Sequence, residues 1–316
     1  MAGFDFPRKN TVRRQWDTPV LEALSKHWCT KFFYCGLPGP KAIDIWLWKS
    51  MIDRVVAFQT LSDIGDPRRE VIDLARELSM LDIPHVVYCG PLEEVVLRRV
   101  DYDGKEFELD ELVTLYNLDF CNCITGSVKT KGGLQRLRFE ALREIAAFQR
   151  DLFRQYGATR FVMLLTVQDT FHANHVNARF KDPDLPEATR RFVQKAGQPV
   201  SFDRDGVLHR STDLLKAFVF TCLSDYLRGQ NIMSVFLPAV AYTGRTNNSP
   251  MLHFVVICEM GLQASPGGSR QSAQDFLGLA TIKATENRIV PNAKWNKGLR
   301  IEDNSAAFLR YAAIIP

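Results

Sequence analysis

Apolar positions along the chain fall into short strand-like runs separated by helix-like periods. The first run, 32–35, breaks at a Gly/Pro cluster at 36–40, and a helical period at 42–52 leads into a β-branched run at 55–58. This order predicts a strand, a tight turn, a helix and a second strand, which together make one βαβ unit. Because such units place ligands at the carboxyl ends of their parallel strands, we expect the loop 36–40 to bind a small molecule.

The same alternation continues through most of the chain. Further helices are predicted at 70–81, 134–156 and 213–227, and further strands at 84–90, 112–120, 161–167, 232–240 and 251–258. Two segments interrupt the alternation: a small hairpin at 100–112, indicated by Asp-Tyr-Asp-Gly-Lys, and a polar insert at 168–210. Because no helix separates the last two strands, we expect them to be antiparallel neighbours.

Three parts are predicted from these patterns. Residues 1–30 form a basic arm and a short helix, 31–260 form the main domain with the inserts 100–112 and 168–210, and 261–316 form a linker and a tail packed on that domain. The arm carries four basic residues: Arg8, Lys9, Arg13 and Arg14. We expect it to be a solvated tail rather than a phosphate-binding segment.

Composition narrows the class of protein. A net charge of +4 over 316 residues permits an anionic partner without requiring one. Seven cysteines, an odd number without the spacing of a disulfide framework, predict reduced thiols in the cytoplasm. The N-terminal residues are polar and basic, and no apolar run has the length of a membrane span, so we expect a soluble protein with no membrane partner.

The predicted order of elements resembles that of the class I, Rossmann-like S-adenosylmethionine-dependent methyltransferases. In that family the last strand is inserted antiparallel beside the fifth, whereas NAD-binding dehydrogenases normally lack this final pair. The resemblance covers about 31–260 at the level of element order. It implies an α/β fold, a three-layer sandwich with a mostly parallel sheet and a C-terminal antiparallel strand pair, and S-adenosylmethionine as the cofactor.

The resemblance also implies which residues hold the cofactor. They are the glycine turn with the residue that precedes it, the ends of the second and third strands, and the end of the fourth: Tyr34, Gly36, Pro38, Gly39, Gln59, Cys89, Gly90 and Asp119. Glycine allows a ligand to approach the backbone closely. The turn departs from the family, because the acidic residue before the glycines is absent and two prolines remove N–H donors. A turn that only connects the strand to the helix remains the alternative.

Gln59 stands where the family has an acidic side chain that binds both ribose hydroxyls. An amide can donate to and accept from hydroxyls, but it lacks the charge that strengthens such hydrogen bonds. Three interpretations follow: the cofactor is held more weakly, Asp63 in the next turn takes over, or the site no longer uses this cofactor.

The end of the fourth strand reads Asp119-Phe120-Cys121-Asn122. It resembles the short motifs of nucleic-acid methyltransferases, although their proline is missing. By this resemblance Asp119, Phe120 and Asn122 are the catalytic candidates: the carboxylate accepts a hydrogen bond from the target amine and the aromatic ring stacks on the base. Such a contact orients the amine more than it acts as a base. The alternative is that Asp119 caps the following loop.

Substrate-binding candidates lie on the same rim: Asp169, His172, His175, Arg179, Lys129 and Lys131. His172 and His175 have no third ligand nearby in the sequence, so no metal site is predicted. Cys121 and Cys123 lack the Pro-Cys setting of nucleophilic methyltransferases. The arm, 129–143 and 179–195 are rich in basic residues, and they form either a phosphate-binding rim or solvated helix faces.

The leading hypothesis is methyl transfer to a nucleic acid at a base amine. The alternative is a catalytically weakened subunit of the same fold that binds or scaffolds a protein partner in a larger complex, which Gln59 and the missing acidic residue favour. A third hypothesis is an enzyme that uses the adenosyl group or a nucleotide for another reaction.

Overall fold

The computed structural model of the chain describes residues 7–62, 65–120, 124, 126, 128–135, 137–156, 160–168, 219, 223, 226–237, 239–243, 250–260 and 299–301. Its helices are α1 Pro7–Val12, α2 Thr18–Trp28, α3 Ile43–Trp48, α4 Arg69–Met80, α5 Leu92–Arg98 and α6 Arg138–Tyr156, with a π-helix η1 Arg13–Asp17 and a 3₁₀ turn η2 Lys49–Met51. Its strands are β1 Phe32–Gly36, β2 Ile52–Gln59, β3 His85–Cys89, β4 Leu115–Asp119, β5 Val128–Thr130, β6 Gly133–Gln135, β7 Arg160–Gln168, β8 Ile232–Phe236, β9 Val240–Thr243, β10 Pro250–Met260 and β11 Leu299–Ile301.

One large sheet runs through the molecule in the order β11-β9-β10-β7-β4-β1-β2-β3, with β8 also paired to β10. The strands β3, β2, β1, β4 and β7 are mutually parallel. β10 lies antiparallel beside β7, and β8 and β9 are antiparallel to β10. The predicted antiparallel neighbours at the C-terminal end of the sheet are therefore confirmed.

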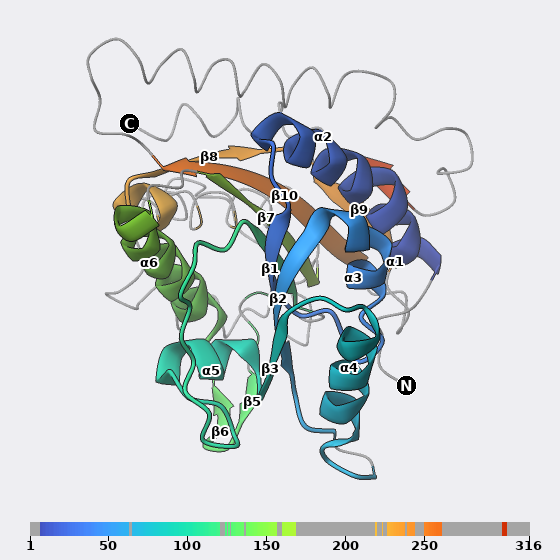
Figure 1. Cartoon of the computed structure of the whole chain (residues 1–316), viewed down its shortest axis with the longest axis vertical. Helices are drawn as coiled ribbons and strands as arrows, with labels where there is room; N and C mark the ends of the chain where they lie inside the picture. Colours follow the sequence, from blue (N-terminus) through green and yellow to red (C-terminus); the bar gives the residue numbers. More distant parts are fainter. Residues whose placement is uncertain are drawn as a thin grey trace, which may run out of the picture.

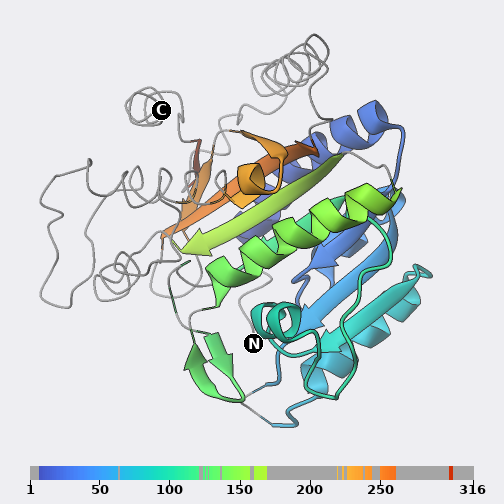
Figure 2. The same cartoon turned by 90° about the vertical axis from the view of Figure 1, so that its left-hand side faces the viewer.

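Helices cover both faces of this sheet, which makes three layers (Figure 1). On one face η1, α2, α3 and α4 bury an apolar layer that includes Leu21, Trp48 and Leu74. On the other face α5 and α6 bury Val95 and Leu142, and Figure 2 shows α6 lying across the sheet. Burying one such leucine or valine contributes about 1.5–3 kcal/mol, so these two layers hold the strand ends in place.

The N-terminal arm was predicted to be solvated, and this prediction is wrong. Residues 7–17 form α1 and η1, and Lys9 and Arg13 are 6% and 4% exposed. The reason is an apolar stripe at helical spacing, Val12, Trp16 and Val20, which is buried in the layer against the sheet and brings Lys9 and Arg13 in with it, while Arg14 stays exposed. The arm is therefore part of the main domain.

Other predicted elements differ in detail. The hairpin at 100–112 is a turn closed by a single bridge between Val100 and Glu106, because the Asp101 carboxylate accepts hydrogen bonds from the N–H groups of Asp103 and Lys105. The sequence analysis did not predict α5 or the β5–β6 hairpin. Of the predicted helix 213–227, the residues that the structure describes are helical. Most of 168–210 and 261–316 lies outside the described residues. None of the described helices is long and apolar enough to span a membrane.

Candidate cofactor and acceptor site

The glycine turn begins where β1 passes closest to β4. The Leu37 N–H donates to the Asn117 carbonyl at 2.9 Å, and a Cβ on Gly36 would lie 2.2 Å from that oxygen. A side chain at Gly36 is therefore excluded by packing alone. Gly39 has a φ of 70°, which favours glycine, and its carbonyl accepts from the Ala42 N–H at 3.1 Å. Pro38 and Gly39 are buried.

Tyr34 and the first turn of α3 form a buried polar group beside this turn. The Tyr34 hydroxyl donates to Asp44 Oδ2 at 2.9 Å, and the Ile45 N–H donates to Asp44 Oδ1 at 3.0 Å. Asn117 Nδ2 donates to both the Tyr34 hydroxyl and Asp44. Burial raises the pKa of Asp44, and the positive charge of Arg13 opposes that rise. Asp44 was not among the predicted site residues. The acidic residue expected before Gly36 is absent, and Asp44 supplies a carboxylate that follows the turn instead.

Gln59 ends β2 and is 4% exposed. Its Nε2 donates to Glu70 Oε2 at 2.7 Å, so the first turn of α4 brings a carboxylate to the end of β2. The Gln59 carbonyl accepts from the Gly90 N–H at 2.9 Å. Glu70 is half-buried and follows Gln59 by eleven residues. It was not among the predicted site residues, because it lies on α4 rather than on β2. Asp63 lies outside the described residues.

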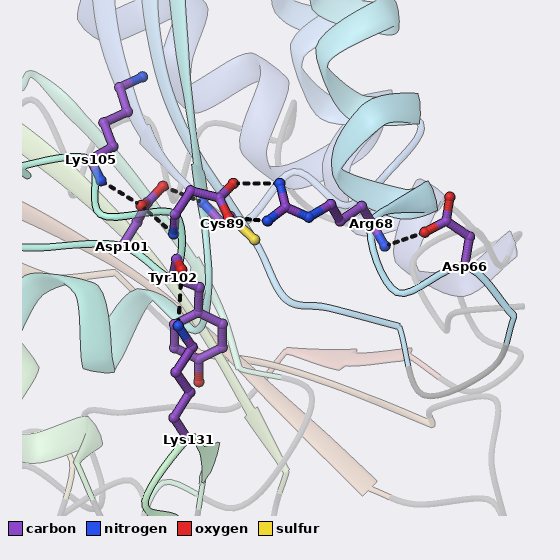
Figure 3. Close-up of polar contacts among 8 residues, drawn as sticks. Asp66, Arg68, Cys89, Asp101, Tyr102, Lys105 and Lys131 are labelled. Carbon is purple, nitrogen blue, oxygen red and sulfur yellow. Dashed lines mark hydrogen bonds and ion pairs between the residues drawn. The ribbon is translucent and has the colours of Figure 1, made fainter.

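The end of β3 is hydrogen-bonded to the turn 101–105, and Lys131 of the β5–β6 hairpin contacts Tyr102 of that turn (Figure 3). The Cys89 N–H donates to Asp101 Oδ2 at 3.0 Å, and the Cys89 carbonyl accepts from the Tyr102 N–H at 2.8 Å. Lys131 Nζ donates to the Tyr102 carbonyl at 2.9 Å and lies 4.5 Å from the centre of its ring. Burial raises the pKa of the Cys89 thiol. Lys131 was predicted on the substrate rim. It contacts Tyr102, which is hydrogen-bonded to Cys89.

Asp119 ends β4, and the ammonium of Lys9 contacts its carboxylate. The side chains of Lys9 and Asp119 are 7% and 3% exposed, so α1 covers this carboxylate with a basic group. Phe120 packs instead in the apolar layer of α5 and α6, with the Arg138 guanidinium 5.3 Å from its ring centre. Asp119 and Phe120 therefore face opposite sides of the sheet, which does not fit the predicted arrangement in which both contact one base.

A second buried polar contact lies beside this pair. Asp119 pairs with Thr166 on β7, and Thr166 pairs with His253 on β10. His253 Nδ1 lies 2.8 Å from Thr166 Oγ1, and His253 Nε2 lies 2.7 Å from Asp17 Oδ1 of η1. These residues line one small pocket with Lys9 and Asp119. The sequence signal for this contact is a histidine within the apolar run 251–258, and His253 was not among the predicted site residues.

The structure describes only some of the remaining candidate residues. Asn122, Asp169, His172, His175 and Arg179 lie outside the described residues. Lys129 is exposed on β5. Within the described part of the chain, no group of three or more His, Cys, Asp or Glu side chains could hold a metal ion.

The order and direction of the strands identify the type of fold. Five parallel strands in the order β3-β2-β1-β4-β7 are followed by β10, which is antiparallel beside the fifth strand, β7. The chain has a Rossmann-like α/β fold with an antiparallel strand beside the fifth parallel one. No family model matches the sequence, and no curated protein matches it.

Several solved structures resemble the chain at low sequence identity. The O-methyltransferase TomG from Streptomyces achromogenes, in complex with SAM, is 12% identical over 79% of this chain and 87% of its own, with a TM-score of 0.36. Trm1 from Pyrococcus horikoshii, with S-adenosyl-L-methionine, is 10% identical over 85% and 58%, with a TM-score of 0.42. TYW2 from M. jannaschii, with AdoMet, is 9% identical over 77% and 76%, with a TM-score of 0.37. These likenesses concern the fold alone.

Proposed function

We propose that the chain binds S-adenosylmethionine at the carboxyl ends of β1 to β4 and transfers its methyl group to an amine held by Asp119. The observation that carries this proposal is the contact between the Asp119 carboxylate and the Lys9 ammonium. A buried carboxylate at the end of β4 accepts a hydrogen bond from a nitrogen cation there, and an acceptor amine would donate to the same oxygens. The acceptor that we propose is a nucleic acid, at a base amine.

The residues at the strand ends fit the cofactor in one respect that the fold does not supply by itself. The hydrogen-bonded pair of Gln59 and Glu70 presents an amide and a carboxylate together at the end of β2. An amide and a carboxylate can bind two neighbouring hydroxyl groups, since one donates and both accept. Gly36 and Gly39 would lie beside the amino-acid part of the cofactor, and Cys89 and Gly90 beside its ring.

In this mechanism the bound cofactor supplies a methyl group on a positively charged sulfur. Asp119 orients the acceptor by accepting a hydrogen bond from its N–H, which leaves the nitrogen lone pair free to point elsewhere. Orientation of this kind lowers the barrier because the reacting atoms are held at contact distance before reaction. The Asp119 carboxylate would also take the proton that the amine loses.

Support for a nucleic acid comes from exposed basic residues near the end of β3. Lys129 and Lys131 lie on the β5–β6 hairpin, which contacts the end of β3 through Tyr102. Lys9 and Arg13, in contrast, are buried and cannot contribute to a phosphate-binding surface. The proposal therefore rests on the hairpin and on the basic runs of the sequence.

One observation favours a second candidate, a binding subunit that has lost catalysis. The same Lys9 ammonium that contacts Asp119 neutralises its charge and occupies its acceptor position. A chain of this kind would bind the cofactor without transferring its methyl group, and would act through a protein partner.

Methyl transfer from radiolabelled S-adenosylmethionine to RNA, DNA and protein fractions separates the two candidates. We expect label in a nucleic-acid fraction with the wild type, and its loss in Asp119→Asn. A matched control is Asp151→Asn, because Asp151 is an exposed carboxylate on α6 and should leave transfer unchanged. Cofactor binding without transfer to any fraction would support the binding subunit, and full transfer by Asp119→Asn would remove Asp119 from the mechanism.

A further inference from the structure

The helix α1 closes the pocket at which the proposed function places the acceptor. Lys9 Nζ contacts the Asp119 carboxylate, and the two side chains are 7% and 3% exposed. The pocket that they line with Arg13, Asn117 and His253 has a volume of about 10 Å³, which is room for one water molecule. An amine carried by a nucleobase is much larger than a water molecule. It can therefore donate to Asp119 only after α1 has moved aside.

The N-terminal helical segment is anchored more firmly after α1 than within it. Trp16 of η1 is buried, and Asp17 Oδ1 of η1 lies 2.7 Å from His253 Nε2 on β10. In α1 the buried residues are Lys9 and Val12, a charged side chain and a small apolar one. Segments that bury few apolar side chains open locally at lower cost than the core of a domain. We therefore expect α1 to leave the sheet while η1 and α2 stay in place.

The π-helix η1 supplies the point at which α1 can bend away. Its flanking residues Val12 and Thr18 both have helical φ and ψ, so α1, η1 and α2 follow one another as one helix with a widened turn in its middle. Thr18 Oγ1 donates to the Arg13 carbonyl across this turn at 2.7 Å. π-helical turns are rare, are frequent at functional sites and are among the usual causes of helix kinks. The widened turn thus separates the weakly held α1 from its anchored continuation.

We propose that α1 is an autoinhibitory segment, which a nucleic acid displaces from Asp119 by binding the basic residues of α1. This inference rests on the proposed function, because it regulates the same acceptor position. While α1 is docked, the Lys9 ammonium is buried against the Asp119 carboxylate. Once α1 is released, Lys9 joins Arg8 and the exposed Arg14 as a cation that phosphates can bind. The same movement uncovers Asp119 for the acceptor amine.

The variant Val12→Ala tests the opening of α1, because it removes apolar contact from α1 and changes no charge. The free full chain is treated with a short pulse of an amine-acylating reagent, and the modified lysines are quantified by peptide mass spectrometry. We expect Lys9 of the wild type to react far more slowly than the exposed Lys26, and Val12→Ala to raise the Lys9 rate several-fold. The matched control is Ile72→Ala, because Ile72 of α4 is 49% exposed. Unchanged hydrogen exchange of α6 shows that the fold as a whole has not opened.

The nucleic-acid part is tested by fluorescence anisotropy with a short single-stranded RNA and no methyl donor. Val12→Ala should bind this RNA several-fold more tightly than the wild type, because the open state that binds is then more populated. Lys9→Met should lower the slope of log affinity against log salt concentration by about 0.7, the share of one phosphate contact on a single strand. Lys9→Arg keeps the charge and should retain the slope, and Ile72→Ala should change neither quantity.

Either of two outcomes would overturn the inference: Val12→Ala that leaves both the acylation of Lys9 and the affinity for RNA unchanged, or a salt slope that is the same in Lys9→Met and the wild type. Methyl transfer by a chain that gives either result would leave the proposed function standing without this role of α1. Failure of the proposed function alone is recognised by the absence of S-adenosylmethionine binding in a chain whose Lys9 acylation and RNA affinity both respond to Val12→Ala.

Discussion

Breaking the contact between Lys9 of α1 and Asp119 at the end of β4 should destabilise the fold. The perturbations are Lys9→Met, Asp119→Ala and the double variant. Both side chains are at least nine-tenths buried. Removing one partner of a buried ion pair leaves the other charge without compensation, which costs about 3–5 kcal/mol.

The double variant should lose much less than the sum of the two single variants, because no charge is then left unpaired. The assay is urea denaturation followed by tryptophan fluorescence, since Trp16 of η1 is buried next to α1. A matched control is Arg76→Met, which removes an exposed ion pair with Asp73 on α4 and should cost about 0–1 kcal/mol. If Lys9→Met costs no more than this control, α1 does not cover Asp119 and the acceptor assignment loses its basis.

Three other substitutions test separate parts of the site. Gly36→Ala should destabilise the fold by about 1–3 kcal/mol or more, because the new Cβ would meet the Asn117 carbonyl; an unchanged thermal midpoint would contradict the close approach of β1 and β4. Gln59→Glu should place two carboxylates side by side with Glu70, so stability and cofactor affinity should both fall at neutral pH and recover in part on acidification. Tighter cofactor binding by this variant would argue that Glu70 does not take part. Burial raises the folded-state pKa of Asp44 above its unfolded value, so its ionisation opposes folding. The free energy of unfolding of the wild type minus that of Asp44→Asn should therefore fall as the pH rises from about 4 through the folded-state pKa. A difference that stays constant with pH would contradict the raised pKa of Asp44.

Most of the sheet could be predicted because its signals are local. The run 55–58 is wholly apolar and 161–167 almost so, and a near-continuous apolar run is typical of a buried parallel strand. The antiparallel end of the sheet followed from the missing helix between the last two strands. The prediction for the N-terminal arm was wrong because it rested on the basic residues of the arm and not on the spacing of its apolar residues. Val12, Trp16 and Val20 recur every four residues, which is the period of a helix packed on a core.

The site was harder to predict because its contacts join distant parts of the sequence. Asp119 could be found from its place at a strand end, but nothing near it indicates that Lys9 is its partner. Asp17 and His253 are 236 residues apart and meet only when η1 packs on β10. Glu70 was missed for the same reason, since its relation to Gln59 depends on how α4 lies on the sheet.

The most direct test of the account is calorimetric titration of the folded full chain with S-adenosylmethionine, S-adenosylhomocysteine and ATP. We predict saturable binding of the first two without binding of ATP, and a clear loss of affinity in Glu70→Gln. The control is Glu77→Gln, because Glu77 lies on the same helix and accepts from Trp46 Nε1 away from β2. No binding of either adenosyl compound, or equal affinity in Glu70→Gln and the wild type, would contradict the proposed cofactor site.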